Sequence, residues 1–181
     1  MGVPSRQCGT SYGNSKTVFK QMNFRVGFGY DVHALAEGES LWLGGIEIPH
    51  EKGTVAHSDG DVLIHAICDA ILGAAALRDI GYHFPDTSSE FKGADSKDLL
   101  RKTVTLLRKE GCEIGNIDST LCAQRPKLKD FIPLMQQKLA EVMEIPVGDV
   151  SVKATTTEKL GFVGQEQGIS AYAVVMLRKR N

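Results

Sequence analysis

An aspartate and a histidine separated by one residue, Asp31 and His33, stand in a segment with the composition of a β-strand. Because strand side chains alternate between the two faces, both point to the same side and lie close together. A second histidine, His65, lies in an alanine-rich helical segment, one turn after Asp61 and one turn before Asp69. One carboxylate and two imidazoles suit zinc, and three protein ligands leave a fourth position open for catalysis.

Each half of this pattern also has a structural explanation. In an isolated Asp-x-His pair, Asp31 more often orients His33 or caps a turn than binds an ion. A ligating imidazole commonly donates its other N–H group to a carboxylate, so Asp61 or Asp69 is the expected partner of His65. The metal-site hypothesis therefore requires that the strand and the helix meet.

Two further segments have residues suited to phosphate. The run 57–61, His-Ser-Asp-Gly-Asp, leads into the helix, where Ser58 or Asp59 is placed to cap the first turn and unpaired N–H groups favour an anion. The run 153–159, Lys-Ala-Thr-Thr-Thr-Glu-Lys, contains Glu158, the hard oxygen ligand that Mg²⁺ prefers. Lys127 follows another expected strand and is a point charge for a nucleotide phosphate. Simple capping and solvated polar turns are the alternative explanations.

The elements that must position these residues alternate between strand and helix patterns. Strands are expected at 24–33, 41–48, 117–123, 150–155 and 169–177, and helices at 61–77, 96–110 and 131–143. Small residues in the first helix allow close packing on a sheet. The predicted fold class is α/β (α+β): a single domain in which helices cover one face of a mixed β-sheet.

Composition excludes several classes of protein. The chain has 181 residues, 42% of them hydrophobic, and a formal net charge of -1, which argues against a non-specific nucleic-acid binder. It has no apolar run near the roughly 18 residues that span a bilayer, and no C-x-x-C pair, so reduced thiols in the cytoplasm are expected. Residues 1–23 are interpreted as a disordered leader or cloning extension, with an organelle-targeting segment as the alternative. The domain is then 24–181.

Six motifs together resemble the 2-C-methyl-D-erythritol 2,4-cyclodiphosphate synthase family, over the stretch from Arg25 to the C-terminus. They are Gly-Tyr-Asp-Val-His at 29–33, His-Ser-Asp-Gly-Asp at 57–61, Asp-Ile-Gly at 79–81, Phe-Pro-Asp at 84–86, Ala-Gln-Arg-Pro-Lys at 123–127, and Lys-Ala-Thr-Thr-Thr-Glu-Lys-Leu-Gly-Phe at 153–162. The resemblance implies a lyase that converts 4-diphosphocytidyl-2-C-methyl-D-erythritol 2-phosphate to the cyclic diphosphate and CMP, in non-mevalonate isoprenoid precursor synthesis. It also implies a homotrimer with active sites between subunits.

The resemblance also assigns roles to residues. Asp31, His33 and His65 would hold Zn²⁺, Glu158 would hold Mg²⁺ or Mn²⁺, and His57 and Thr156 would stabilise the transition state. The substrate would be bound by residues around the methylerythritol part, the cytidine and the phosphates: Asp31, Val32, His33, His57, Ser58, Asp79, Ile80, Gly81, Phe84, Pro85, Asp86, Thr87, Ser88, Ala123, Lys127, Leu128, Lys129, Ala154, Thr155, Thr156, Thr157, Glu158, Phe162 and Gln165.

Gln165 departs from the family pattern, since an arginine is frequent there near the trimer axis. An uncharged amide is a weaker partner for an anion, so a central phosphate or isoprenoid-diphosphate site is not expected to follow from the resemblance. Two other functions use the same residues. One is a metal-dependent phosphohydrolase with water as nucleophile, and the other is a non-catalytic trimer that binds cytidine nucleotides or isoprenoid diphosphates.

Overall fold

The structure, a computed structural model, describes residues 23–85 and 93–179. The expected leader lies outside the described residues except for its last position, so its predicted state and the boundary at residue 24 stay predictions. The elements in chain order are β1 (Phe24–Glu37), β2 (Leu41–Leu43), β3 (Ile46–Ile48), β4 (Lys52–Val55), α1 (Val62–Ala75), α2 (Ile80–His83), α3 (Ser96–Lys109), β5 (Cys112–Cys122), α4 (Ile132–Met143), the 3₁₀ turn η2 (Val147–Asp149), β6 (Val150–Thr155), α5 (Gly161–Gly164) and β7 (Gly168–Lys179).

The main sheet has five strands in the order β4-β1-β7-β5-β6. The β5–β6 pair is parallel, and the other neighbouring pairs are antiparallel. β1 and β7 pair along most of their lengths, from Phe24 opposite Arg178 to Ala34 opposite Gly168. The predicted mixed sheet in a single α+β domain is thereby confirmed.

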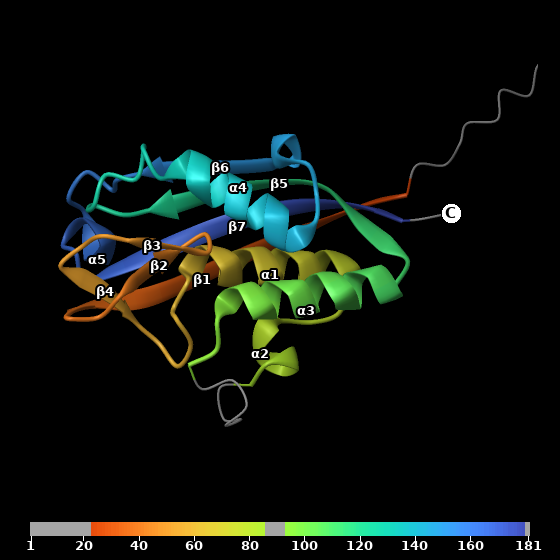
Figure 1. Cartoon of the computed structure of the whole chain (residues 1–181), viewed down its shortest axis with the longest axis horizontal. Coiled ribbons are helices and arrows are strands. Elements are labelled where there is room, and N and C mark those ends of the chain that lie inside the picture. Colours follow the sequence, from red (N-terminus) through yellow and green to blue (C-terminus); the bar gives the residue numbers. More distant parts are fainter. Residues whose placement is uncertain (1–22, 86–92, 180–181) are drawn as a thin grey trace, which may run out of the picture.

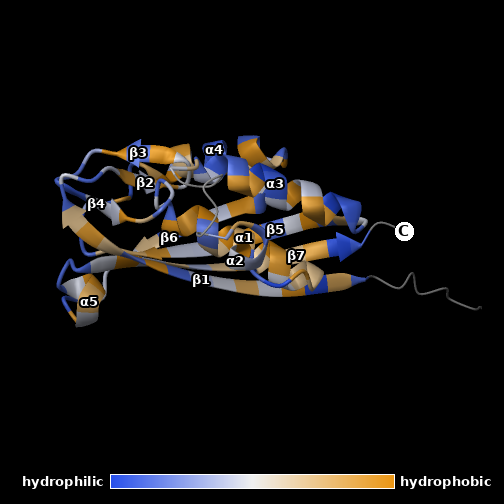
Figure 2. Cartoon of the chain, turned by 90° about the horizontal axis from the view of Figure 1, so that it is seen from below, coloured by the Kyte–Doolittle hydropathy of each residue, from blue (hydrophilic) through white to orange (hydrophobic). Residues whose placement is uncertain are grey.

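The three long helices lie on one side of this sheet. α1 packs on β1 and β7, α3 packs on α1, and α4 packs on β6 (Figure 1). Viewed along the layer, α1, α3 and α4 share one side of β1, and the short α5 extends beyond the other side (Figure 2). Among the helices of residues 23–85 and 93–179, none is long and apolar enough to cross a membrane.

Two glycines of β1 allow α1 to approach the sheet closely. A Cβ atom added at Gly29 would lie 1.9 Å from the carbonyl oxygen of Ala66, and one added at Gly27 would lie 1.9 Å from that of Ala70. Real side-chain carbons do not approach backbone oxygen this closely, so only glycine fits. The next positions on this face of β1 are Asp31 and His33, which are therefore held directly against the start of the same helix.

The segment 41–48 differs from the single strand expected from its apolar composition. It forms a hairpin in which Gly44 and Gly45, both with positive φ, turn the chain between β2 and β3. The carboxylate of Asp61 accepts hydrogen bonds from both glycine N–H groups, with N–O distances of 2.9 and 2.6 Å. The turn is therefore fixed by a buried side chain that lies far away in the sequence, which local periodicity does not reveal.

Candidate metal centre and adjoining pockets

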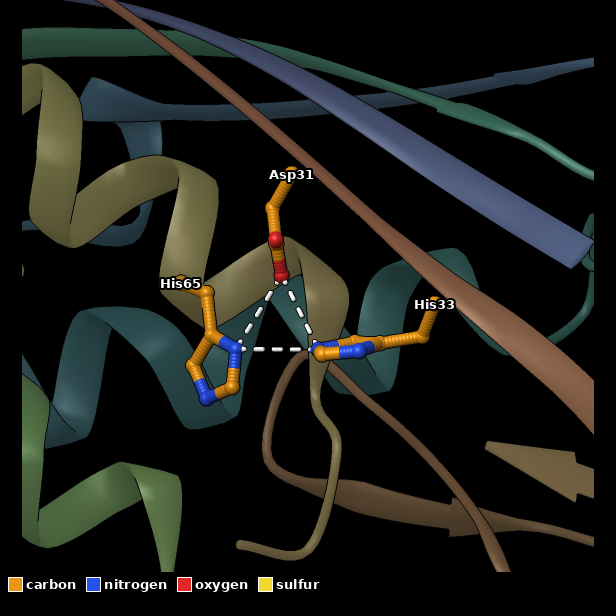
Figure 3. A group of neighbouring side chains, drawn as sticks. All are labelled: Asp31, His33 and His65. Atoms are coloured by element: carbon orange, nitrogen blue, oxygen red, sulfur yellow. Dashed lines mark hydrogen bonds and ion pairs between the residues drawn. The ribbon is translucent and has the colours of Figure 1, made fainter. Parts of the chain in front are cut away.

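Three side chains from two elements converge at the N-terminal half of α1. Asp31 and His33 project from the same face of β1, and His65 projects toward them from the second turn of the helix (Figure 3). These residues form the only cluster of at least three possible metal-ligating His, Cys, Asp or Glu side chains found among the described residues. All three side chains are partly buried.

The donor atoms have the spacing of ligands around one small cation. Asp31 Oδ2 lies 3.1 Å from both His33 Nε2 and His65 Nδ1, and the two nitrogens are 3.2 Å apart. In a tetrahedral zinc site with bonds of about 2.0–2.1 Å, neighbouring ligand atoms lie about 3.3 Å apart. The observed triangle is therefore close to one face of such a tetrahedron, with the fourth corner left for another ligand.

Hydrogen bonds and charge within this cluster favour an anionic carboxylate at Asp31. Burial raises the pKa of Asp31, but hydrogen bonds and charge from His33 and His65 outweigh it, so the pKa lies well below its usual range. Burial lowers the pKa of His65, yet the hydrogen bond and negative charge of Asp31 outweigh burial and raise it. The anionic carboxylate thus attracts positive charge, which a divalent cation supplies more strongly than a proton.

The two carboxylates that flank His65 on the helix have other partners than the one expected from their spacing. Asp61 is fully buried, caps α1 by accepting from the N–H group of Ile64, and anchors the hairpin turn. Asp69 accepts from the N–H group of Ile80 at 2.7 Å. The prediction that Asp61 or Asp69 orients His65 is therefore wrong, because both carboxylates accept hydrogen bonds from backbone N–H groups of other segments.

Two serines occupy the position expected for that carboxylate. His65 Nε2 lies 2.9 Å from Ser96 Oγ and 3.3 Å from Ser58 Oγ. Ser96 Oγ donates in turn to Asp59. The capping prediction for Ser58 and Asp59 is also wrong, since Asp61 caps the helix while Ser58 and Asp59 accept from Gly60 and Asp61 N–H groups within the loop. The sequence did not identify Ser96 as a partner of His65, because helix periodicity shows only that Ser96 lies at the start of a helix.

A cavity of about 330 Å³ opens beside the three donor atoms. Seven of the predicted substrate or catalytic residues line it, and the structure brings them together with His65: Asp31, His33, His57, Ser58, Ile80, Gly81 and Phe84. Four lining residues were not predicted to contact the substrate: Val55, Ala56, Asp69 and Leu99. We refer to this cavity as the metal-side pocket. Asp69 contributes to its wall and also fixes the adjacent backbone of Ile80.

A second cavity, of about 310 Å³, lies at the C-terminal ends of β5 and β6. It is lined by seven other predicted residues, namely Ala123, Lys127, Leu128, Lys129, Ala154, Thr155 and Thr156, together with Gln124, Pro126 and Ile132. We refer to it as the β5–β6 pocket. It shares no lining residue with the metal-side pocket, so one chain divides the predicted site between two separate cavities.

The remaining predicted residues that the structure describes line neither of these pockets. Thr156 Oγ1 donates to Glu158 Oε1 at 2.8 Å, which places Glu158 at the edge of the β5–β6 pocket in an exposed turn. Asp79 instead caps α2 by accepting from the N–H group of Tyr82. The others that the structure describes outside these linings are Val32, Pro85, Thr157, Phe162 and Gln165, whereas Asp86, Thr87 and Ser88 lie outside the described residues.

The fold and this geometry define a single-domain α+β protein with a carboxylate–imidazole site suited to a divalent cation. The YgbB family model matches residues 24–178. The chain belongs to this family, whose members among its relatives are named 2-C-methyl-D-erythritol 2,4-cyclodiphosphate synthase. The family predicted from the six sequence motifs is confirmed.

Individual relatives match over nearly their whole length. The synthase of Bacteroides fragilis is 65% identical over 158 residues, which cover 87% of this chain and 99% of the relative. The synthase of Porphyromonas gingivalis is 62% identical over 154 residues, covering 85% and 95%. Among solved structures, IspF of Plasmodium falciparum in complex with CDP superimposes with a TM-score of 0.77 at 35% identity, covering 87% of this chain and 97% of that one.

Proposed function

We propose that this chain cyclises 4-diphosphocytidyl-2-C-methyl-D-erythritol 2-phosphate to 2-C-methyl-D-erythritol 2,4-cyclodiphosphate and CMP. An oxygen of the 2-phosphate attacks the β-phosphorus of the diphosphate, the bond from that phosphorus to the CMP oxygen breaks, and an eight-membered ring closes. The names of the relatives and the CDP complex of one of them support this reaction. The observation that carries it is the convergence of Asp31, His33 and His65 at the wall of the metal-side pocket.

Asp31, His33 and His65 would hold Zn²⁺, and Glu158 together with substrate phosphates would hold Mg²⁺ or Mn²⁺. When bound, these ions neutralise the repulsion between the two phosphates and polarise the phosphorus that is attacked. Because nucleophile and electrophile belong to one molecule, the side chains mainly position them. Ser58, whose hydroxyl oxygen already accepts from Gly60, can direct its hydrogen to a diphosphate oxygen.

Other residues would act on the developing charge and the leaving group. We assign the imidazole of His57 and the hydroxyl of Thr156 to the charge developing in the transition state. Both side chains are exposed in the single chain, as groups that contact a ligand must be before it binds. The Thr156 hydroxyl donates to Glu158 in the single chain and would turn to the substrate once that carboxylate binds an ion. Lys127 of the β5–β6 pocket would contact a phosphate of the cytidine diphosphate group, and the apolar part of that pocket would hold the base.

Replacing Glu158 by glutamine should lower turnover about 100-fold or more at limiting Mg²⁺, because the amide is a weaker ligand for a hard cation. Raising the Mg²⁺ concentration should restore part of the rate, and the zinc content should stay unchanged. The measurement is the initial rate of CMP release across a Mg²⁺ titration. Glu144→Gln is the matched control, because Glu144 is also an exposed glutamate with positive φ, at 57° against 51°. Equal behaviour of the two variants would remove Glu158 from the site.

We also propose that three copies assemble so that the metal-side pocket of one subunit meets the β5–β6 pocket of the next. This arrangement would reunite the predicted residues that a single chain divides between two cavities. The face of β1 and β7 opposite the helices supplies a surface for assembly, since it exposes apolar side chains: Val26, Phe28, Tyr30, Val32, Tyr172 and Val174. A contiguous exposed apolar face of this kind is typical of an interface between proteins.

Phe28→Asp tests this assembly, since Phe28 is 63% exposed in the single chain and packs on Tyr172, with ring centroids 6.3 Å apart. We expect sedimentation to give a mass of three chains for the wild type and of one chain for the variant. The variant should keep zinc, because one chain supplies all three ligands, but should lose turnover. Leu134→Asp is the control, since Leu134 is 53% exposed on α4. A trimeric Phe28→Asp protein would argue against this face as the interface.

The proposed reaction is tested by one incubation of the zinc- and magnesium-loaded protein with 4-diphosphocytidyl-2-C-methyl-D-erythritol 2-phosphate. We expect equal amounts of CMP and of the cyclic diphosphate, identified by phosphorus NMR and mass spectrometry. Release of CMP with a linear product would instead identify a phosphohydrolase. Binding of the substrate without turnover would identify a non-catalytic nucleotide-binding protein.

A further inference from the structure

We propose that Ser96 and Asp59 form a hydrogen-bond relay that determines which nitrogen of His65 faces the metal site. The two residues would be positioning residues, because they act through the imidazole and not on the substrate. This inference rests on the metal site in the proposed function. It adds a role for two side chains that neither the sequence motifs nor the pocket linings identify as ligands.

The relay starts at the ring nitrogen of His65 that points away from Asp31. His65 Nδ1 lies 3.1 Å from Asp31 Oδ2, whereas Nε2 lies 2.9 Å from Ser96 Oγ on the opposite edge of the ring. Ser96 Oγ contacts Asp59 Oδ1, and the Ser96 backbone N–H donates to Asp59 Oδ2 at 2.9 Å. The Asp59 carboxylate thus accepts hydrogen bonds from both the N–H and the hydroxyl group of Ser96, and the same hydroxyl oxygen contacts the His65 ring.

The chemistry of these groups gives the relay a direction. An ionised carboxylate only accepts hydrogen bonds, so the single hydroxyl hydrogen of Ser96 is directed to Asp59. Toward His65, Ser96 Oγ can then only accept, which requires the hydrogen of the neutral ring on Nε2. A lone pair on Nε2 would instead face the serine lone pairs with no hydrogen between them. Nδ1 is therefore left with its lone pair directed to the metal site.

Both members of the relay are themselves held in place. Ser96 is the first residue of α3 and has no exposed surface. Asp59 Oδ1 also accepts from the N–H group of Asp61, at 3.2 Å, and the Asp59 N–H donates to the carbonyl of Ala94, at 3.1 Å. The loop before α1 and the start of α3 are thereby joined behind the imidazole, which fixes the ring plane as well as the tautomer.

Ser58 is a weaker candidate for the same task. Its Oγ lies 3.3 Å from His65 Nε2, farther than that of Ser96, and no carboxylate among the contacts of the described residues accepts from it. Because nothing fixes its hydrogen, Ser58 can serve as donor or acceptor and does not select a tautomer. Ser96 therefore defines the relay, and Ser58 remains free for the substrate.

Zinc affinity measured by competition with a chromophoric chelator tests the relay. Asp59→Asn places an amide hydrogen against Ser96 and should weaken zinc binding about 10- to 100-fold. Ser96→Ala should also weaken it, and adding Asp59→Asn to Ser96→Ala should cost little more, because the two residues act in series. Asp95→Asn is the matched control: Asp95 caps the same helix by accepting from the N–H group of Lys97 and should leave the affinity unchanged.

A spectroscopic readout separates the relay from a purely structural effect. In zinc-loaded protein with ¹⁵N-labelled histidine, the Nε2-bound proton of His65 should give a slowly exchanging NMR signal, which Ser96→Ala removes. Persistence of that signal in Ser96→Ala, or equal zinc affinities of Asp59→Asn and Asp95→Asn, would overturn the relay while leaving the metal site intact. A wild-type protein that binds no zinc would overturn both the relay and the metal site.

Discussion

The His65→Ala variant is expected to lose its bound zinc, from about one ion per chain to near zero, and to lose turnover by a factor of about 10³ or more. The variant removes one of three protein ligands and leaves Asp31 and His33 as a two-ligand site too weak to retain the ion. A bound cation contributes several kcal/mol to the stabilisation of charge in the transition state, and about 4 kcal/mol corresponds to this factor. Elemental analysis of dialysed protein and the rate of CMP release measure the two effects.

The His65→Ala protein should still fold, because alanine is the best helix former and α1 is rich in it. Far-UV circular dichroism and the sedimentation mass check this. His50→Ala is the control, since His50 is also partly buried but lines neither pocket. If His65→Ala keeps the zinc stoichiometry of the His50→Ala protein, then His65 does not bind the ion.

The Gly29→Ala variant is expected to lose more than about 3 kcal/mol of its free energy of unfolding, or to fail to fold. The new methyl carbon would lie 1.9 Å from the Ala66 carbonyl oxygen and 2.8 Å from the Ala70 nitrogen, both in the backbone of α1. A helix backbone cannot relieve such a clash locally, as a side chain does by changing its rotamer. The whole helix must therefore shift away from β1. Because β1 and α1 carry the metal ligands, any folded fraction should also bind zinc less tightly.

Urea unfolding at a fixed protein concentration measures the loss of stability, since assembly makes stability depend on concentration. Gly73→Ala is a control in α1 itself, where the nearest neighbour of the added carbon would be the Phe28 carbonyl oxygen, 4.0 Å away. A glycine-to-alanine change at an exposed helical position should raise stability by about 1 kcal/mol. The two substitutions should therefore have opposite signs. A Gly29→Ala protein as stable as the wild type would contradict the close contact of α1 and β1.

Two features of the sequence favoured the convergence of the three metal ligands, namely strand alternation and the small residues of the helix. Alternation along a strand puts Asp31 and His33 on one face, and the small residues of the following helix allow close packing on a sheet. The structure shows β1 and α1 in this contact, with Gly29 at the closest approach. Helix 96–110 was also predicted to within one residue, since its apolar spacing and Gly111, with positive φ, mark its end.

The partners of buried carboxylates could not be predicted from spacing. Asp61, His65 and Asp69 share a helix face, but a helix face does not show which backbone donors of distant segments reach it. Asp61 accepts hydrogen bonds from the N–H groups of Gly44 and Gly45. These two glycines form the turn that divides the expected strand 41–48 into two. The one local signal for Ser96 was its place after a capping aspartate, which by itself predicts only a helix start.

The motifs of one chain also could not predict that the site residues are divided between two cavities. Residues such as Ser58 and Lys127 were assigned to a single ligand, yet they line different pockets of the chain. The resemblance anticipated this through the expectation of a shared site. Spacing along the sequence contains no information on which surfaces of separate copies meet.

The most direct test of the metal centre is anomalous X-ray scattering at the zinc edge from crystals of the zinc-loaded protein. We predict one strong peak per chain, about 2.0–2.1 Å from Asp31 Oδ2, His33 Nε2 and His65 Nδ1. No peak between these three atoms in crystals grown with zinc, or a peak bound only by other residues, would contradict the account.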